Sequence, residues 1–272
     1  MRTITTIALA GLTASAAHAQ FQFFSSADAV LYRGTDGGLT DTFNGADEIR
    51  GMSILENGVS INGASFGDVI AVSSPQGQND AQEVYRVDNA FSGTPSLVQI
   101  GVTSNPVSDI AFANGRIFGV DNSGPAGTIL VREFDSNFNE INTFNTGINI
   151  VDRGAGGLAY DPANDIFYVT DPDSDQLWSY SLGGNATLLG NAGFDVGQND
   201  LAMFNGKLYA AIAELGRGTY NIGEFNTSDG SFFNLVTVGA YPGGAIGAVV
   251  IPATPTLALL GLGGLAAARR RR

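Results

Sequence analysis

The sequence contains no cysteine, and its single histidine is His18. The lack of cysteine excludes disulfides, thiol nucleophiles and thiolate metal ligands. Because His18 falls in a segment that we expect to be cleaved off, the mature chain has no imidazole. A Ser-His-Asp triad, a Cys-His pair and a histidine-ligated zinc site are therefore excluded.

Basic residues are also scarce. Five of the 13 Lys and Arg residues, Arg2 and the four at 269–272, lie in terminal segments that contain no acid. The part between these segments has 8 bases against 26 acids, which is a net charge of −18. Nucleic acid is not an expected partner, because its phosphates require a positive surface. A divalent cation, a neutral polysaccharide or a protein surface is more compatible with this charge.

Residues 1–19 have the pattern of a secretory signal peptide. Arg2 precedes an apolar helical segment of small residues, which ends in the A-x-A sequence Ala17-His18-Ala19. Signal peptidase accepts small side chains one and three positions before the cut, so we predict Gln20 as the first mature residue. A permanent membrane anchor is the alternative, but the apolar run is short for that role.

Residues 251–272 form a second sorting segment. The sequence Pro252-Ala253-Thr254-Pro255 is followed by an apolar stretch at 256–268 and by Arg269, Arg270, Arg271 and Arg272. A helix over the apolar stretch would be about 20 Å long, against a hydrocarbon core of about 30 Å. We therefore expect a transient membrane association, with the arginines on the cytoplasmic side.

These C-terminal residues resemble the tail of PEP-CTERM proteins, which an exosortase recognises and processes. The resemblance covers about the last twenty residues, and it departs at the motif, since the family's usual Pro-Glu-Pro is here Pro252-Ala253-Thr254-Pro255. It implies an exosortase-type processing enzyme as a partner. It also implies a location at the cell-envelope surface or in the extracellular matrix.

The body between the two segments contains an internal repeat. A first strand with the pattern apolar, Ala, bulky apolar is followed by a turn and a second apolar strand, and two of the turns are Asn-Gly. Asn-Gly is a strong signal for a tight hairpin, because both central residues tolerate positive φ. The three first strands are Asp109 to Phe112, Gly157 to Tyr160 and Asp200 to Met203.

Two more strands complete each unit, so that four strands recur about every 45 residues, as in a β-propeller blade. The alanine in each first strand fits a crowded innermost position. A more divergent unit begins at Gly51. The segments Ala29 to Arg33 and Leu39 to Phe43 look like outer strands, and Ile246 to Val250 looks like an inner strand that would join them.

The sequence therefore predicts an all-β domain over residues 20–250, a propeller of about five four-stranded blades closed by N- and C-terminal strands. A β-sandwich or an open set of hairpins is the alternative. The unit from Gly157 to Asp171 also resembles, at the level of the fold, exported propeller proteins found ahead of such tails. Many unrelated functions occur on that fold.

Asp171, Asp173 and Asp175 place three carboxylates at alternate positions, a spacing that suits Ca²⁺. Gln176 and Leu182 stand where the EF-hand pattern needs glycine and glutamate, so an ordinary solvated turn is the alternative and the preferred interpretation. Calcium is the one cofactor that the sequence suggests.

Two functional hypotheses remain. The first is a non-enzymatic surface propeller that binds polysaccharide, protein or Ca²⁺, and the second is a secreted hydrolase or lyase that uses Asp or Glu and Ca²⁺. The second requires two acids held about 5 to 10 Å apart. The loops before the inner strands are the place to look, although loop acids are usually solvated. They contain Asp47, Glu48, Arg50, Asp109, Asp152, Arg153 and Asp200.

Aromatic residues of the third repeat unit could stack on sugars, but their alternating placement favours a role in the core between blades. They are Tyr160, Phe167, Tyr168, Trp178 and Tyr180. No residue in the sequence stands out as catalytic, and the binding hypothesis is favoured.

Overall fold

A computed structural model describes residues 21–27, 29–35, 38–44, 48–73, 81–121, 127–150, 156–240 and 246–252. Most of the predicted sorting residues lie outside these ranges: Ala17, Ala19, Gln20, Ala253 to Pro255 and Arg269 to Arg272. The expected signal helix and C-terminal apolar helix lie outside them too. Across the described part of the chain, no helix is long and apolar enough to cross a bilayer.

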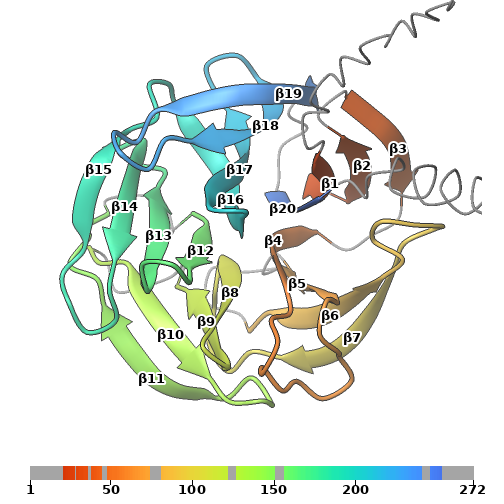
Figure 1. Ribbon diagram of the computed structural model, residues 1–272, viewed down its shortest axis with the longest axis horizontal. Coiled ribbons are helices and arrows are strands. Elements are labelled where there is room, and N and C mark those ends of the chain that lie inside the picture. The colour runs from red at the N-terminus through yellow and green to blue at the C-terminus, as the bar shows by residue number, and fades with distance from the viewer. Residues whose placement is uncertain are drawn as a thin grey trace, which may run out of the picture. The chain divides into compact units, whose positions relative to one another are not determined.

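The described strands form five four-stranded sheets around a central axis, which is a five-bladed β-propeller (Figure 1). Four blades are consecutive in sequence, with their first strand innermost. These are β4 (Ile49–Ile54), β5 (Val69–Ser73), β6 (Glu83–Asp88) and β7 (Ser96–Val102); β8 (Asp109–Ala113), β9 (Arg116–Val120), β10 (Leu130–Phe134) and β11 (Glu140–Asn145); β12 (Leu158–Asp161), β13 (Ile166–Asp171), β14 (Gln176–Tyr180) and β15 (Thr187–Asn191); and β16 (Val196–Phe204), β17 (Lys207–Glu214), β18 (Thr219–Phe225) and β19 (Phe232–Ala240).

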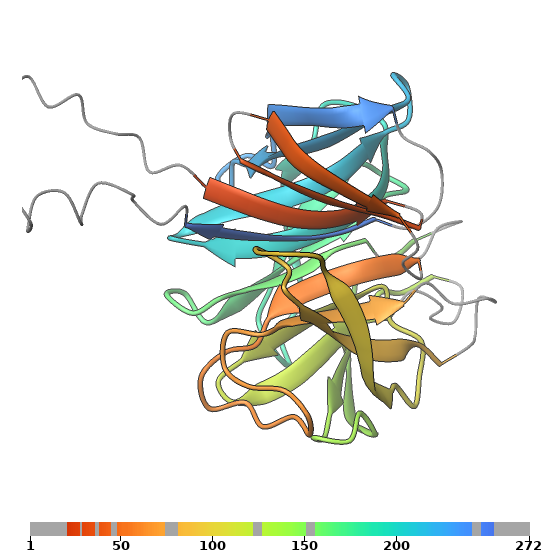
Figure 2. The ribbon, with the colours of Figure 1, turned by 90° about the vertical axis from the view of Figure 1, so that its right-hand side faces the viewer.

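The fifth blade joins the two ends of the domain. Its strand order is β20 (Ile246–Pro252), β1 (Phe21–Ala27), β2 (Val30–Thr35) and β3 (Gly38–Asn44). Figure 2 shows the red N-terminal strands lying beside the blue β20. The prediction of closure between N- and C-terminal strands is confirmed, and closure leaves the ring without a gap between its first and last blades.

The sequence analysis missed β1. We expected two outer strands, 29–33 and 39–43, to meet an inner strand directly, but β1 lies between β20 and β2. Phe23 packs with Tyr220 of the blade before it, whereas Phe24 packs with Met52 of the blade after it. Because both faces of β1 are buried, its sequence lacks the apolar and polar alternation that marks a half-buried strand.

The hydrophobic core consists of one cluster between each pair of neighbouring blades. Phe118 and Phe167, for example, meet edge to face with ring centroids 5.0 Å apart between the blades of β8 and β12. Burial of large side chains on both faces of every sheet replaces the disulfides that the chain cannot form. The aromatic residues Phe167, Tyr168 and Tyr180 belong to these clusters, as the core interpretation predicted.

The Asn-Gly hairpins adopt the predicted backbone. Asn114 and Gly115 have φ values of 52° and 79°, and Asn205 and Gly206 have 49° and 73°. Positive φ at both central positions matches the twist of the flanking strands. These turns connect the innermost strand of a blade to the second strand, so they fix the ends of the strands that surround the axis.

Candidate functional site

Asp109 begins the innermost strand β8, and its carboxyl group is fully buried at the centre of the ring. Its Oδ1 accepts the N–H of Ile110 at 2.6 Å, and its Oδ2 accepts the N–H of Leu158 on β12, also at 2.6 Å. The N–H of Leu201 on β16 is a further donor to this carboxyl group. Asp109 thus connects the inner strands of three blades.

Asp200 lies at the equivalent position of β16 and is also fully buried. Its Oδ2 accepts the N–H of Met52 on β4 at 2.9 Å and the N–H of Ala248 on β20. Together the two carboxyl groups accept one N–H from each of the five innermost strands. The pair therefore links all five blades through the backbone of their innermost strands.

The two carboxyl groups are hydrogen-bonded to each other, which requires a proton on one of them. Burial raises the pKa of Asp109 to about 7, while the bond from Asp200 acts in the opposite direction. Burial and the negative charge of Asp109 raise the pKa of Asp200 well above its ordinary value. The bond between the two groups lowers the pKa of Asp109 and raises that of Asp200, which assigns the proton to Asp200, whose Oδ1 accepts no N–H group. Two adjacent buried carboxylates cannot both be ionised at low cost.

Glycines surround the pair. The five aligned inner strands carry Gly51, Asp109, Gly157, Asp200 and Gly247 at the same position. A Cβ on Gly51 would lie 2.5 Å from the Cα of Asp109, and a Cβ on Gly157 would lie 2.6 Å from the backbone nitrogen of Leu201. Close backbone contacts therefore leave no room for a side chain at Gly51 and Gly157, whereas a Cβ on Gly247 would meet the side chains of Ile49 and Met52 at 3.1 Å.

The carboxyl pair is closed to a substrate. Both side chains are 0% exposed, and their oxygens already bind N–H groups or each other. The expectation that acids before the inner strands are solvated is therefore wrong for Asp109 and Asp200. Of the other candidates there, Glu48 and Arg50 are partly buried, and Arg50 Nη2 lies 3.4 Å from Gln198 Oε1. Asp47, Asp152 and Arg153 lie outside the described residues.

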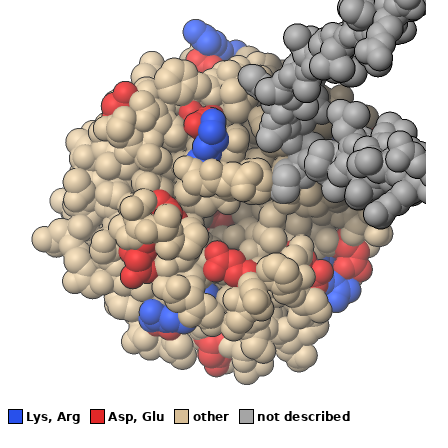
Figure 3. All heavy atoms as spheres, viewed as in Figure 1, with Lys and Arg blue, Asp and Glu red and all other residues tan. Residues whose placement is uncertain are grey.

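A cavity of about 230 Å³ opens at the other end of the inner strands, beyond the carboxyl pair. The face drawn in Figure 3 is hollowed near the centre of the ring. Ala111, Ala159 and Ala202, the small residues of the repeated first strands, lie on the innermost strands as predicted, but they line this cavity rather than a fully crowded axis. The other lining residues are Ser53 to Glu56, Phe66, Phe112, Leu158, Tyr160, Leu201, Met203, Val249 and Val250.

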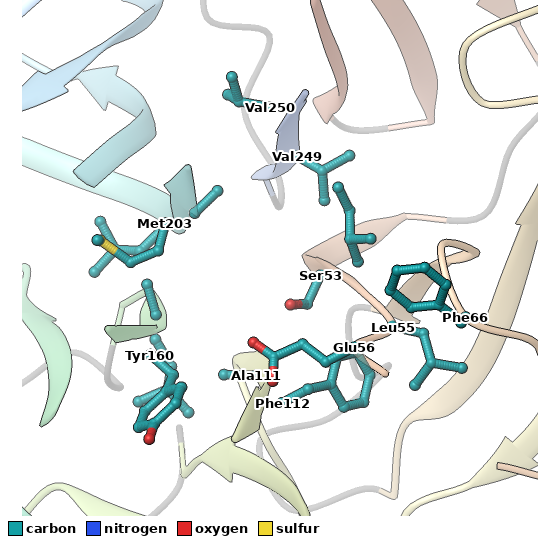
Figure 4. Close-up of a pocket in the computed structure, with 15 residues that line it drawn as sticks. Ser53, Leu55, Glu56, Phe66, Ala111, Phe112, Tyr160, Met203, Val249 and Val250 are labelled. Atoms are coloured by element: carbon teal, nitrogen blue, oxygen red, sulfur yellow. The ribbon is translucent and has the colours of Figure 1, made fainter. Parts of the chain in front are cut away.

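Glu56 is the one acid among the described residues of this wall. It follows β4, is partly buried, and points its carboxylate toward the middle of the cavity, as the Ser53 hydroxyl does (Figure 4). Burial raises the pKa of Glu56 above its ordinary value. The sequence analysis missed Glu56, because an acid two residues after a strand is a common feature of a turn.

Tyr160 lies at the edge of the cavity, and its hydroxyl points away from it (Figure 4). That hydroxyl donates to Asp165 Oδ1 at 2.7 Å and lies 2.8 Å from Asn114 Nδ2. Burial and Asp165 raise the pKa of Tyr160 to about 12. Tyr160 is therefore a neutral aromatic wall rather than an acid or base for chemistry.

The predicted calcium residues lie around the loop between β13 and β14. Asp171 accepts the N–H of Asp173 at 2.9 Å and the hydroxyl of Ser174, and Asp175 accepts the N–H of Val196 at 2.7 Å. No group of three acids or histidines that could hold a metal ion occurs among the described residues. The calcium site stays a prediction, and the observed bonds are those of a polar turn.

No known family model matches the chain, and no curated protein matches it. Similar solved structures include a nidogen/laminin complex, at 10% identity and a TM-score of 0.47, over 85% of this chain and 98% of that one. A luciferin-regenerating enzyme matches at 13% identity and a TM-score of 0.46, over 82% and 73%. A quinonprotein alcohol dehydrogenase-like protein from Bacteroides thetaiotaomicron matches at 12% and 0.40, over 85% and 68%. At these values the likeness carries no argument about function.

Proposed function

We propose that the protein is exported and acts as a non-enzymatic binding propeller, with the cavity at the ends of the inner strands as its binding site. The observation that carries the proposal is that the buried carboxyl pair, Asp109 and Asp200, lies apart from the accessible cavity. The carboxyl pair that resembles a catalytic dyad in its raised pKa values is fully buried, whereas the accessible cavity has Glu56 as the one acid among its described lining residues.

A hydrolase or lyase needs more than this cavity offers. Glycoside hydrolysis uses two carboxyl groups on either side of the bond that breaks. Asp109 and Asp200 have no exposed surface, and the wall beside Glu56 consists mainly of apolar side chains. A concave apolar site with few polar groups suits the binding of a ligand. The geometry therefore favours binding over the hydrolase alternative.

Export is supported by the two sorting patterns and by their position relative to the strands. The first described strand begins at Phe21, directly after the predicted first mature residue Gln20. The last strand ends at Pro252, where the predicted tail motif begins. Cleavage by signal peptidase, and by an exosortase-type enzyme near Pro255, would thus leave every described strand intact. In that location, the protein would be surrounded by the polysaccharides and proteins of the cell surface.

Mass spectrometry of the protein from fractionated native cells tests the proposal. We expect the protein in the envelope or medium fraction, beginning at Gln20 and ending near Pro255 with a new attachment. A protein that stays in the cytoplasm with Met1 and Arg269 to Arg272 intact would overturn the exported role. A cytoplasmic enzyme control from the same cells shows that fractionation was clean.

A further inference from the structure

The Glu56 carboxylate is a charge without a counter-charge in an apolar cavity. Among the described residues it has no hydrogen-bond donor and no cationic partner, and its raised pKa comes from burial. Because Glu56 is partly buried against apolar groups, its carboxylate loses part of its hydration, and this loss costs free energy. A ligand with a positive charge next to Glu56 would compensate for this free energy.

The surrounding groups favour an organic cation over a metal ion. A hard cation such as Ca²⁺ takes six to eight oxygens, whereas the lining side chains that direct oxygens into the cavity are Glu56 and Ser53. Aromatic rings provide the rest of a typical ammonium site, since a cation is attracted to a ring face. Phe66 is 74% exposed at the cavity wall and is the ring that a ligand can reach most easily, whereas Phe112 and Tyr160 border the cavity with only 2% and 6% of their surface exposed.

A sugar or a polysaccharide end fits less well. Sugar hydroxyls need several hydrogen-bonding groups, but the Tyr160 hydroxyl is already bonded to Asp165 and lies away from the cavity. The remaining wall is mainly aliphatic and includes Met203, Val249 and Val250. These side chains suit an alkyl or aryl tail.

The volume limits the size of that tail. Sites for drug-sized ligands have volumes of about 300 to 1,000 Å³, and this cavity has about 230 Å³. A compound with one ammonium group and a short tail therefore matches it better than an oligomer does.

We propose that the cavity binds a small organic ammonium ion, with its nitrogen on Glu56 and Ser53 and its apolar tail against the ends of the inner strands. This inference rests on the proposed function, which places the binding site in this cavity. It adds the chemical class of the ligand.

Calorimetric titration of the full-length protein with 2-phenylethylamine, butylamine and the neutral 2-phenylethanol tests the inference. We expect at least one amine to bind, and 2-phenylethanol to bind about tenfold or more weakly than 2-phenylethylamine. Glu56→Gln, which keeps the side-chain size, should weaken amine binding by a similar factor. Glu224→Gln removes a surface acid on β18 outside the cavity and should leave the affinity within about twofold.

Ala202→Phe fills the cavity and should abolish binding of every probe. If this variant does not fold, the comparison of Glu56→Gln with Glu224→Gln decides, because both substitutions are nearly isosteric. Equal binding of 2-phenylethanol and 2-phenylethylamine would overturn the ammonium ligand while leaving a binding cavity. Failure of both amines to bind wild-type protein would also overturn it, independently of where the protein is found in the cell.

Discussion

The carboxyl groups of Asp109 and Asp200 are hydrogen-bonded to each other, and between them they accept an N–H group from each of the five innermost strands. Asp109 binds the inner strands of three neighbouring blades, and Asp200 binds those of the other two. This arrangement connects residues as far apart in sequence as Met52 and Ala248. The acids at the centre of the ring therefore hold the blades together.

The two aspartates should respond differently to the same substitution. Asp200→Asn keeps an oxygen for the N–H groups of Met52 and Ala248, and its amide replaces the proton that faces Asp109. Asp109→Asn turns an NH₂ group toward the N–H of Ile110 or Leu158. We expect Asp109→Asn to lower the free energy of unfolding by about 1 to 3 kcal/mol, and Asp200→Asn to change it little. Urea unfolding near pH 7 measures both. Equal losses would contradict the assignment of the proton to Asp200.

The glycines beside the pair should be intolerant of a methyl group. Gly157→Ala places a Cβ 2.6 Å from the Leu201 backbone, so we expect a loss of about 1 to 3 kcal/mol in thermal or urea unfolding. Gly239→Ala is the matched control, because its Cβ would meet nothing within 4 Å in the outermost strand β19. A Gly157→Ala protein as stable as the control would show that the inner strands are less closely packed than described.

Calcium removal should leave the thermal stability unchanged if the Asp171 loop is a polar turn. Its carboxylates already bind the N–H groups of Asp173 and Val196, so a metal ion would compete with these bonds. We expect a Tm within about 1 °C in EDTA and in excess Ca²⁺, since a specific ligand of the folded state would raise it. A larger rise that Asp173→Asn abolishes would instead establish the calcium site.

Amine binding in the cavity should weaken as the pH falls through the pKa of Glu56. Burial raises this pKa above 4.5, and protonation removes the charge that pairs with the ammonium group. Tyr160, with a pKa of about 12, stays neutral over this range, and its partner Asp165 lies on the hydroxyl side, away from the cavity. Titrations with 2-phenylethylamine from about pH 4 to about pH 8 measure the effect. Glu56→Gln should give a flat profile, and a flat wild-type profile would exclude Glu56 as the ammonium partner.

The sequence was sufficient to predict the blades, because local signals determine them. Asn114-Gly115 and Asn205-Gly206 require positive φ, and the alternation in the third strands reports one buried face. Even the innermost strands aligned correctly, and that alignment contains the glycine and aspartate pattern at the axis. The glycine and aspartate pattern was visible in the aligned repeat. Its role could not be predicted, because the hydrogen bonds come from N–H groups on five strands that are far apart in sequence.

The remaining features depend on tertiary contacts. β1 was missed because Phe23 and Phe24 pack in opposite directions against different blades, which removes the alternation of a half-buried strand. In the sequence, Asp109 and Asp200 resemble solvated loop acids. They are buried only because closure of the ring excludes water from them. Glu56 can be recognised as a candidate only in the folded structure, because residues from five inner strands and one loop form the cavity wall around it.

The pH dependence of stability tests most directly whether the acidic centre is a structural pair with a proton on one of its carboxyl groups. The folded pKa values of Asp109 and Asp200 lie above the ordinary 3.8, so the folded protein binds more protons than the unfolded chain. The stability that the pair gives is full below that value and is lost as pH rises through about 7 and beyond. The sequence has one histidine, His18, which lies outside the described strands, so no imidazole among the described residues titrates in this range. Between pH 5.5 and pH 8.5, we predict a falling free energy of unfolding for wild type, by up to about 1.4 kcal/mol per pH unit for each proton, and a flatter profile for Asp200→Asn. A wild-type profile that rises with pH, or coincides in slope with Asp200→Asn, would contradict the account.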